Sequence, residues 1–420
     1  MKVLDPKIYL SKILSGAKPV SGEEHRYKSG NDSTHGENLI RLFYDRKGIE
    51  AATQMSVFEQ LAEKREMPLK LGKEYTCARW MRSYERELKS ADFLKYGFLS
   101  SRDIADVSAG FDARKLAEGA TEGFKINVKK QNLSTKFQRY GEMIEYTDEV
   151  ELFSNDDVQV RYREELGASA GQIFDDLVQF SMLTTNTVMY TGAATSLATM
   201  GNGIKADGTL DDNYRISYDF IRKCVAKLVR NRAEKNTEIV TGSTKIDTRT
   251  VSPAYYCFIG PEVANDLDYL TRLKGTAAET AAFIPAHQYA SASTLAKGEI
   301  GQMGEVRFIL AESMLVERQQ GVEVPTGYVG TLSYTGEIGA ADAAKKAKFD
   351  VFPILFPTKG SFATVSLKGN GKVVFHSKAP SEIGRGNPFG TKGFFSSNFW
   401  YAGLILREER LLKAYCLASA

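Results

Sequence analysis

Histidine is scarce in this chain, which limits the metal and acid–base chemistry that it can perform. The four histidines are His25, His35, His287 and His376. No two of them have the spacing of a zinc-binding HExxH helix, in which two imidazoles lie one turn apart. His25 and His35 stand in a polar stretch and are interpreted as solvated side chains. The sequence therefore predicts no metal site built on histidine, while a site made only of carboxylates stays open.

The cysteines do not indicate a disulfide framework. Cys77, Cys224, Cys257 and Cys416 are scattered and form no CxxC pair. Four cysteines in a chain of this length favour reduced, buried thiols over structural bridges.

Motifs for nucleophilic and phosphate chemistry are missing from the sequence. It contains no GxxxxGK[ST] phosphate loop and no GxGxxG after a strand. The run Gly167 to Gly171 matches GxSxG by its letters, but it lies inside a predicted helix and not on a strand-to-helix turn, so it is not interpreted as a nucleophile elbow. The glycine-rich run from Gly384 to Gly390 is predicted to be a turn-rich loop. The sequence therefore offers no candidate catalytic residue and no cofactor site, and we expect that the protein is not an enzyme.

Clusters of like charge have a plain interpretation. The pairs Asp156–Asp157 and Asp175–Asp176 are adjacent, so on a helix their side chains diverge by about 100° and do not form a catalytic dyad. Lys345, Lys346 and Lys348 are interpreted as a solvated turn.

Composition indicates a globular protein with a sizeable core. The chain has 420 residues, of which 43% are hydrophobic, and a formal net charge of +3. This length suffices for two lobes. A nearly neutral charge does not favour a dedicated nucleic-acid binder but is compatible with loose contact with DNA. Because we find neither a signal-peptide core nor an apolar run of about 20 residues, we expect a soluble protein made in the cytosol.

The most informative stretch runs from Arg139 to Leu183 and predicts a strand, a helix cap and one long amphipathic helix. Ser154 or Asn155 can cap this helix, and Asp156 and Asp157 suit its first turn. An apolar stripe recurs at three- and four-residue steps, formed by Val158, Tyr162, Leu166, Ser169, Ile173, Leu177 and Phe180. The small residues Gly167 to Gly171 predict close approach of another backbone, with a simple kink as the alternative.

The other segments predict shorter elements. The N-terminal 70 residues are polar, with a loop from Ser21 to Asn38. Strands are expected in residues 74–90, 121–128, 133–147, 255–259, 306–310, 328–334, 349–355 and 364–367, and helices in residues 218–232 and 262–270. The apolar tail, residues 394–420, is expected to return to the core. Together these elements predict an α+β fold.

One segment carries a resemblance to a known family. The run RYGEMIEYTDEVELFSNDDV, followed by a helix containing LGASAGQIFDDLVQFSML, resembles the core motif of a major capsid protein family of tailed bacteriophages, the podophages that package a giant virion RNA polymerase. The matching residues are Tyr140-Gly141, Thr147-Asp148-Glu149 and Ala170 to Asp175-Asp176. Glu118 to Glu122 resembles a further family element but lacks its proline. The motif match covers roughly residues 115–190.

The resemblance implies the Johnson (Hong Kong 97-like) capsid fold. In that fold residues 1–73 would be the N-terminal arm and residues 74–147 the extended loop (E-loop) with its flanking strands. Residues 148–214 would form the peripheral domain with the spine helix, and residues 215–390 the axial domain. Residues 391–420 would return to the peripheral domain.

The resemblance also implies a function and partners. The chain would be a major capsid protein that assembles with itself into the pentamers and hexamers of an icosahedral head enclosing double-stranded DNA. Its partners would be other copies, a portal protein, possible scaffolding and decoration proteins, and DNA by weak contact, with no membrane. The shell would assemble in the host cytoplasm.

Two sets of residues are candidates for the contacts that such a shell needs. The E-loop candidates for contact between subunits are Phe111, Arg114, Lys115, Leu116, Glu118, Glu122, Phe124 and Lys125. The candidates for packing of the spine helix are Val158, Tyr162, Leu166, Gly167, Gly171, Ile173, Leu177 and Phe180.

Two alternatives stay open at this point. A nanocompartment shell protein of the same fold would enclose an enzyme cargo, and its neighbouring genes would encode that enzyme. A glycan-active or receptor-binding phage protein belongs to another class. A glycan-active enzyme would need convergent carboxylates, which the sequence does not indicate.

Overall fold

The computed structural model describes residues 57–80, 104–119, 121–125, 130–153, 158–208, 214–240, 248–267, 270–274, 277–281, 283–288, 295–340, 342, 344–367, 373–381 and 387–419. The chain divides into two compact units. Of the described residues, unit 1 comprises those in Gly141–Ser169 and Phe375–Ser397, and unit 2 comprises those in 57–140, Ala170–Val374 and Asn398–Ala420. The expected arm as far as residue 56 and the helix-cap candidates Ser154 to Asp157 lie outside the described residues.

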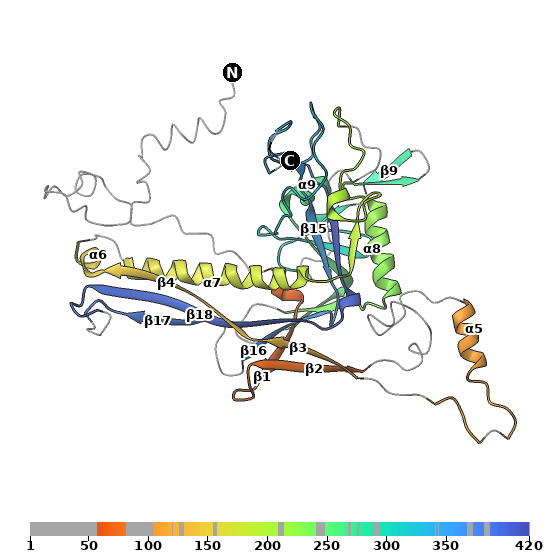
Figure 1. Cartoon of the computed structure of the whole chain (residues 1–420), viewed down its shortest axis with the longest axis horizontal. Coiled ribbons are helices and arrows are strands. Elements are labelled where there is room, and N and C mark those ends of the chain that lie inside the picture. Colours follow the sequence, from red (N-terminus) through yellow and green to blue (C-terminus); the bar gives the residue numbers. More distant parts are fainter. Residues whose placement is uncertain are drawn as a thin grey trace. The chain divides into compact units, whose positions relative to one another are not determined.

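Unit 2 is organised around an eight-stranded mixed sheet (Figure 1). Its order is β10-β11-β12-β7-β15-β19-β5, and β6 pairs with β7. β12 runs parallel to β7, and β19 runs parallel to β5. The strands are β5 (Val188–Tyr190), β6 (Asn236–Val240), β7 (Thr248–Ile259), β10 (Ile284–Pro285), β11 (Glu299–Met303), β12 (Val306–Leu310), β15 (Phe352–Pro357) and β19 (Leu411–Cys416).

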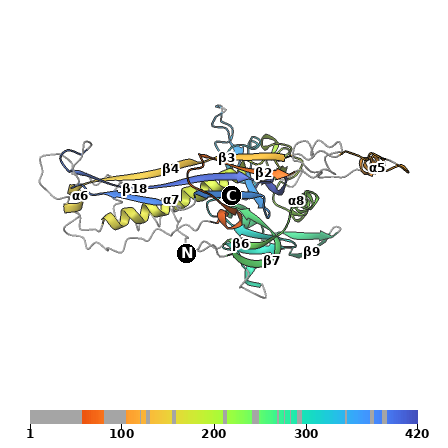
Figure 2. The same ribbon diagram turned by 90° about the horizontal axis from the view of Figure 1, so that it is seen from below.

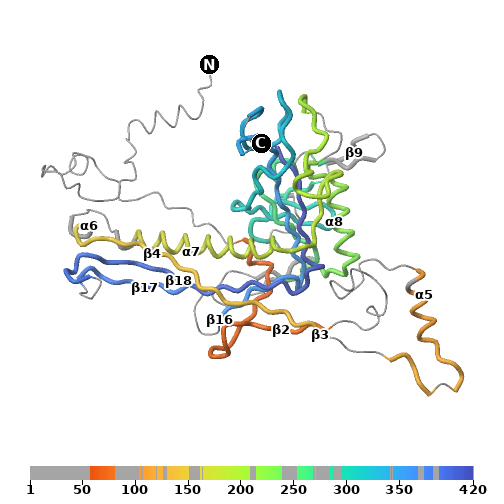
Figure 3. The backbone as a smooth tube through the Cα atoms, viewed as in Figure 1, coloured from red at the N-terminus to blue at the C-terminus, as the bar shows by residue number. Residues whose placement is uncertain are grey.

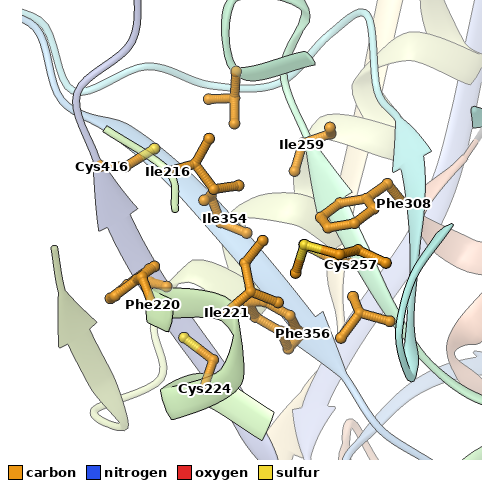
Figure 4. Close-up of a cluster of buried hydrophobic side chains, with 14 of the residues drawn as sticks. Ile216, Phe220, Ile221, Cys224, Cys257, Ile259, Phe308, Ile354, Phe356 and Cys416 are labelled. Atoms are coloured by element: carbon orange, nitrogen blue, oxygen red, sulfur yellow. The ribbon is translucent and has the colours of Figure 1, made fainter. Parts of the chain in front are cut away.

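Helix α8 (Tyr218–Arg230) covers one face of this sheet. It begins after Ser217, whose hydroxyl accepts a hydrogen bond from the backbone N–H of Phe220 at 3.3 Å. Its buried face consists of Phe220, Ile221, Cys224, Val225 and Leu228. These side chains join a cluster that includes Cys257 of β7, Ile354 of β15 and Cys416 of β19 (Figure 4). The helix predicted over residues 218–232 is confirmed.

Three of the four cysteines lie in this cluster. Cys224, Cys257 and Cys416 are free and buried, and Cys77 is free and half-buried. Burial raises the pKa of the Cys224, Cys257 and Cys416 thiols, because a thiolate would lose its hydration. These three thiols therefore stay protonated and pack as small apolar side chains.

The opposite face of the sheet packs against the C-terminal half of α7 (Val158–Leu183) and the 3-10 helix η1 (Phe58–Leu61). The buried side chains of α7 here are Ala170, Val178 and Met182, and Phe58 packs on Phe258 with ring centroids 4.8 Å apart. Successive residues of a strand point to opposite faces, which is why Cys257 meets α8 while Phe258 meets η1.

Asp175 joins η1 to α7. Its carboxylate is buried and accepts hydrogen bonds from the backbone N–H groups of Val57 and Phe58, each at 3.2 Å. It therefore satisfies two donors at the start of η1 that have no partner in a turn of helix. Gln60 holds the other side of this segment, because its amide exchanges two hydrogen bonds with the backbone of Lys297.

Two further sets of strands pair with β18 (Lys392–Ile405). In unit 2, β1 (Glu63–Met67) runs parallel to β16 (Phe362–Leu367), and β16 pairs antiparallel with residues 402–405 of β18. β4 (Gln138–Thr147) and β17 (Val374–Lys378) also pair with β18. The boundary between the units falls inside β4, α7 and β18.

Unit 1 has a small aromatic core. Tyr146 stacks on Phe395 with centroids 5.4 Å apart, and both pack with Tyr162 and Leu166. A Cβ atom on Gly393 would lie 2.6 Å from the ring of Tyr146, so only glycine fits there. α6 (Asp148–Phe153) follows β4 directly; the sequence patterns did not predict it.

The remaining elements are short. They are β8 (Thr271–Lys274), β9 (Ala277–Ala281), β13 (Tyr334–Thr335), β14 (Lys348–Phe349), α9 (Pro261–Leu267), η2 (Leu197–Thr199), η3 (Ala286–Gln288) and η5 (Glu408–Arg410). None of the helices in the described part of the chain combines the length and apolar character that crossing a bilayer requires.

The strand expected over residues 328–334 is wrong. Only Tyr334 and Thr335 form a strand there; Leu332 makes an isolated β-bridge with Ser419, and the other residues from 328 to 333 are irregular. Gly327 has a φ of 79°, and the hydroxyl of Tyr328 accepts a hydrogen bond from the backbone N–H of Leu332 at 3.2 Å. Tyr328 and Leu332 are thus buried side by side without a regular strand, whereas Val329 and Tyr334 stay exposed.

The buried stripe of α7 has a different phase from the one expected. Leu166, Ala170, Val178 and Met182 are buried, whereas Phe180 is 63% exposed. Phe180 follows Val178 by two residues, which turns it by about 200° to the other side of the helix. The expectation that Phe180 packs with the stripe is therefore not met within this chain.

Neither glycine of α7 lies close to another backbone in the described part of the chain. The nearest atom to a Cβ placed on Gly167 is a ring atom of Phe375 at 3.9 Å, and a Cβ on Gly171 would meet nothing within 4 Å. The expected close backbone approach is thus absent from the described residues of this single chain, and α7 continues as a helix through both glycines.

Replacing Asp175 should loosen the attachment of η1. We expect Asp175→Ala to lower the free energy of unfolding by about 1–3 kcal/mol, because the buried N–H of Phe58 and the part-buried N–H of Val57 lose their acceptor. Urea unfolding followed by circular dichroism measures this. Gln172→Ala, at an exposed position of the same helix, is the control and should change stability by less than about 0.5 kcal/mol. Equal urea midpoints for the two variants would contradict the capping role.

Candidate assembly surface

A two-stranded ribbon in unit 2 has one exposed side. β2 (Glu74–Trp80) pairs antiparallel with β3 (Lys130–Lys136), from Glu74 opposite Lys136 to Trp80 opposite Lys130. The two strands run side by side in Figures 2 and 3. β2 confirms the start of the strand predicted over residues 74–90, and residues 81–90 lie outside the described residues. β3 and β4 together confirm the prediction for residues 133–147, with a break at Phe137.

One side of the ribbon rests on the body of unit 2. Tyr75, Cys77 and Leu133 pack on buried Leu404 and its neighbours, and the hydroxyl of Thr135 donates to the carbonyl of Gly403 at 2.9 Å. Residues of the other side alternate with these and are exposed. An isolated two-stranded ribbon is marginally stable in water, so this contact is what holds it in place.

A buried ion pair fixes the ribbon to the last part of the chain. The guanidinium of Arg79 lies 3.1 Å from a carboxylate oxygen of Glu409, and the two side chains are 16% and 6% exposed. The backbone carbonyl of Glu409 also accepts a hydrogen bond from the amide of Asn231 at 2.6 Å. Breaking such a pair leaves a buried charge without its partner, so β2 is held firmly at this position.

The segment between the two strands carries its own local structure. α5 (Ile104–Asp112) is followed by a turn in which Arg114 donates to the carbonyl of Gly110 at 2.8 Å. The guanidinium of Arg114 also lies 4.6 Å from the ring centroid of Phe124. This contact brings the chain after α5 back toward the helix.

All the E-loop candidates named from the sequence are described, and they lie in this segment. Phe111 and Leu116 are 62% and 66% exposed, and Phe124 is 38% exposed although Arg114 covers one of its faces. Lys125 pairs with Glu122 at 3.3 Å. Lys115 and Glu118 are exposed. Their contact with a second copy stays a prediction, since these are contacts within one chain.

The spine-helix candidates are spread over both units. Tyr162 and Leu166 belong to the core of unit 1, and Ile173 and Leu177 pack against the core of unit 2. The side chain of Val158 lies outside the described residues.

The described residues hold no group of three or more His, Cys, Asp or Glu side chains that could bind a metal ion.

The contacts that organise the exposed surface were not evident from the sequence. Arg79 and Glu409 are 330 residues apart, and nothing local marks either one. The turn from Asn387 to Gly390 is different, because the order Asn-Pro-Phe-Gly is a recognisable β-turn signal.

Comparison with known proteins gives one match in sequence. The chain is 27% identical to the major capsid protein of Pseudomonas phage KPP21 over 317 residues, which cover 74% of this chain and 73% of that protein. No family model matches the sequence.

The fold is shared with a solved capsid structure. The capsid of Ralstonia phage GP4 superposes with a TM-score of 0.53 and 12% identity, covering 93% of this chain and 99% of that one. The capsid structure of Cyanophage P-SCSP1u gives a TM-score of 0.49 and 12% identity over 92% and 95% of the two chains. The predicted α+β fold of Johnson (Hong Kong 97-like) type is confirmed. The finer expectation of a podophage that packages an RNA polymerase stays a prediction.

The Arg79–Glu409 pair should contribute more to the stability of the subunit than an exposed charged side chain does. We expect Glu409→Ala to destabilise the subunit by about 3 kcal/mol, because Arg79 is left without its buried partner. Urea unfolding measures the loss, and Glu312→Ala, at an exposed site, is the control. The double variant Arg79→Met/Glu409→Leu should recover part of the stability. A Glu409→Ala variant as stable as the control would show that the pair does not hold β2.

Proposed function

We propose that this chain is the major capsid subunit of a bacteriophage head, which assembles into pentamers and hexamers and encloses double-stranded DNA. The observation that carries the proposal is the sequence match to a phage major capsid protein over about three quarters of both chains. The shared fold agrees with it. The phage origin of that relative favours a virus head over a nanocompartment shell.

The segment between β2 and β3 supplies the contact between neighbouring copies in this proposal. Burying a Phe or Leu side chain contributes about 1.5–3 kcal/mol, whereas an exposed ion pair contributes about 0–1 kcal/mol. Phe111, Leu116 and Phe124 should therefore supply most of the binding energy. The Glu122–Lys125 pair and the nearby charges would set the register.

The same contact would also build the five- and six-membered rings of subunits in the proposed shell. A head-to-tail contact places one surface of a copy on a different surface of the next, and it closes when the rotation between copies matches five or six subunits. In the proposed map residues 1–73 form the arm, 74–147 the E-loop, 148–214 the peripheral domain, 215–390 the axial domain and 391–420 the returning strand. The proposed partners are other copies, a portal protein and possible scaffolding and decoration proteins.

The proposed work of the chain is structural and not enzymatic. Proteins related to it in sequence and fold are capsid components. Assembly would take place in the host cytoplasm, and DNA would be held by weak, non-specific contacts with scattered Lys and Arg side chains.

Expression of the full chain, alone and together with the neighbouring phage genes, tests the proposal. Negative-stain electron microscopy should show closed shells with five- and six-fold capsomers. A subunit that stays monomeric under both conditions would overturn it.

Phe124 gives a sharp test of the contact. We expect Phe124→Asp to abolish shell assembly while leaving a soluble, folded subunit, because a charge in the buried contact is desolvated without a partner. Phe124→Leu keeps the apolar character and should still assemble. Circular dichroism checks folding, and normal particles formed by Phe124→Asp in negative stain would contradict the role of Phe124.

Contact with DNA should be weak and electrostatic. Binding of the isolated subunit to duplex DNA should fall at least about tenfold between 50 and 200 mM salt, since binding through phosphates releases counterions. Filter binding or fluorescence anisotropy measures this. Tight binding that salt does not weaken would argue for a dedicated nucleic-acid site.

A further inference from the structure

A rigid turn in unit 1 presents an aromatic side chain to solvent. Asn387, Pro388, Phe389 and Gly390 form a β-turn, in which the N–H of Gly390 donates to the carbonyl of Asn387 at 3.3 Å. Proline at the second position presets the backbone for such a turn. Gly390 has a φ of 67°, a conformation that glycine adopts without strain.

The side chain of Asn387 fixes this turn. Its amide nitrogen donates to the carbonyls of Pro380 and Lys392, at 3.1 and 2.8 Å. Its oxygen accepts from the N–H groups of Thr391 and Lys392, at 2.9 and 3.2 Å. Both amide hydrogens and both lone pairs are thus used, and the side chain is buried. The turn therefore has little freedom to fold its exposed residues inward.

The segments next to the turn are also held by specific contacts. The N–H of Asp148 donates to the carbonyl of Thr391 at 3.0 Å, which joins the start of α6 to the turn. Gly393 lies against Tyr146, whose ring stacks on Phe395. The name tip is used below for this platform, residues 145–149 and 387–393.

Phe389 stands on the tip without cover. It is 88% exposed, more than any other large apolar side chain among the described residues. An aromatic side chain held in water by a saturated hydrogen-bond network has the features of a preorganised interface anchor, because little conformational entropy is lost when it binds.

We propose that Phe389 inserts into a contact between the tips of neighbouring copies of this chain. This inference rests on the proposed function, because it requires that copies assemble. It adds a contact separate from the segment that carries Phe124, and it assigns Phe389 as the anchor and Asn387 as the residue that positions it.

The charges of the tip favour another copy as the occupant. The tip carries the exposed side chains of Glu145, Glu149 and Lys392 and the half-buried Asp148, and no ion pair joins any of them to another side chain in the described part of the chain. A contact between like surfaces is opposed when the surface has one sign of charge, and it is favoured when both signs are present. Lys392 of one copy can therefore pair with Glu145 or Glu149 of the next, beside the central phenylalanine.

Assembly of full-length variants tests the anchor. Light scattering against subunit concentration should show that Phe389→Ala raises the concentration needed for shells at least tenfold, while Phe389→Leu raises it less. Asn387→Ala should act in the same direction, because it frees the turn. His376→Ala, exposed on β17 of the same unit, is the control and should assemble as the unchanged chain does. Thermal melts followed by circular dichroism verify that each variant is folded.

Photocross-linking identifies the occupant. Residue 389 is replaced by p-benzoylphenylalanine in the full chain, and ¹⁵N-labelled and unlabelled subunits are mixed before assembly and irradiation. We expect mixed-isotope cross-links from residue 389 to residues 145–149 or 387–393 of another copy. Cross-links only within one copy, to another region of a second copy or to a different protein would overturn the proposal.

The two proposals fail in different ways. If the unchanged chain forms no shells, the proposed function fails and this inference falls with it. If the unchanged chain forms shells and the folded Phe389→Ala and Asn387→Ala variants assemble at the same concentration, only this inference is overturned.

Discussion

The arrangement of this protein depends on burial of both faces of β7. Tyr255, Cys257 and Ile259 contribute to the core under α8, while Tyr256 and Phe258 contribute to the core beneath α7 and η1. A strand buried on both sides needs a layer on each. The rest of unit 2 supplies those layers from distant parts of the sequence, so α7, α8 and η1 are all placed by one strand.

Parts of the chain outside the central sheet are held in place by fewer contacts. The β2–β3 ribbon rests on one side only, and it is fixed by the Arg79–Glu409 pair and by the bond from Thr135 to Gly403. The segment beyond it exposes Ile104, which is 87% accessible, and other large apolar side chains. Several large apolar side chains exposed on one segment are characteristic of a protein that binds other chains. In the proposed shell, the neighbouring copy supplies the cover that the chain itself does not.

Two exposed surfaces each present an apolar side chain on a segment that other side chains hold in place. Arg114 holds Phe124 by its guanidinium, and Asn387 holds the turn of Phe389 by four hydrogen bonds. Rigid anchors bind with less loss of entropy than mobile ones. Repetition over many subunits lets modest contacts build a stable shell, which is why such a chain needs no reaction centre to perform its proposed task.

The sequence by itself determined the elements whose signal is local. The pattern of α8, the apolar run of β12 and the strand–turn–helix of β7 and α9 were all predicted at nearly their observed positions, because periodicity, caps and proline act over a few residues. The family motif around Tyr140 and Asp175 indicated the fold. Only the tertiary structure decided the phase of α7, the turns around Tyr328 and the acceptor role of Asp175. Asp175 lies 118 residues from Val57, and the identity of its partner follows from how the folded chain brings η1 against α7, which no local pattern encodes.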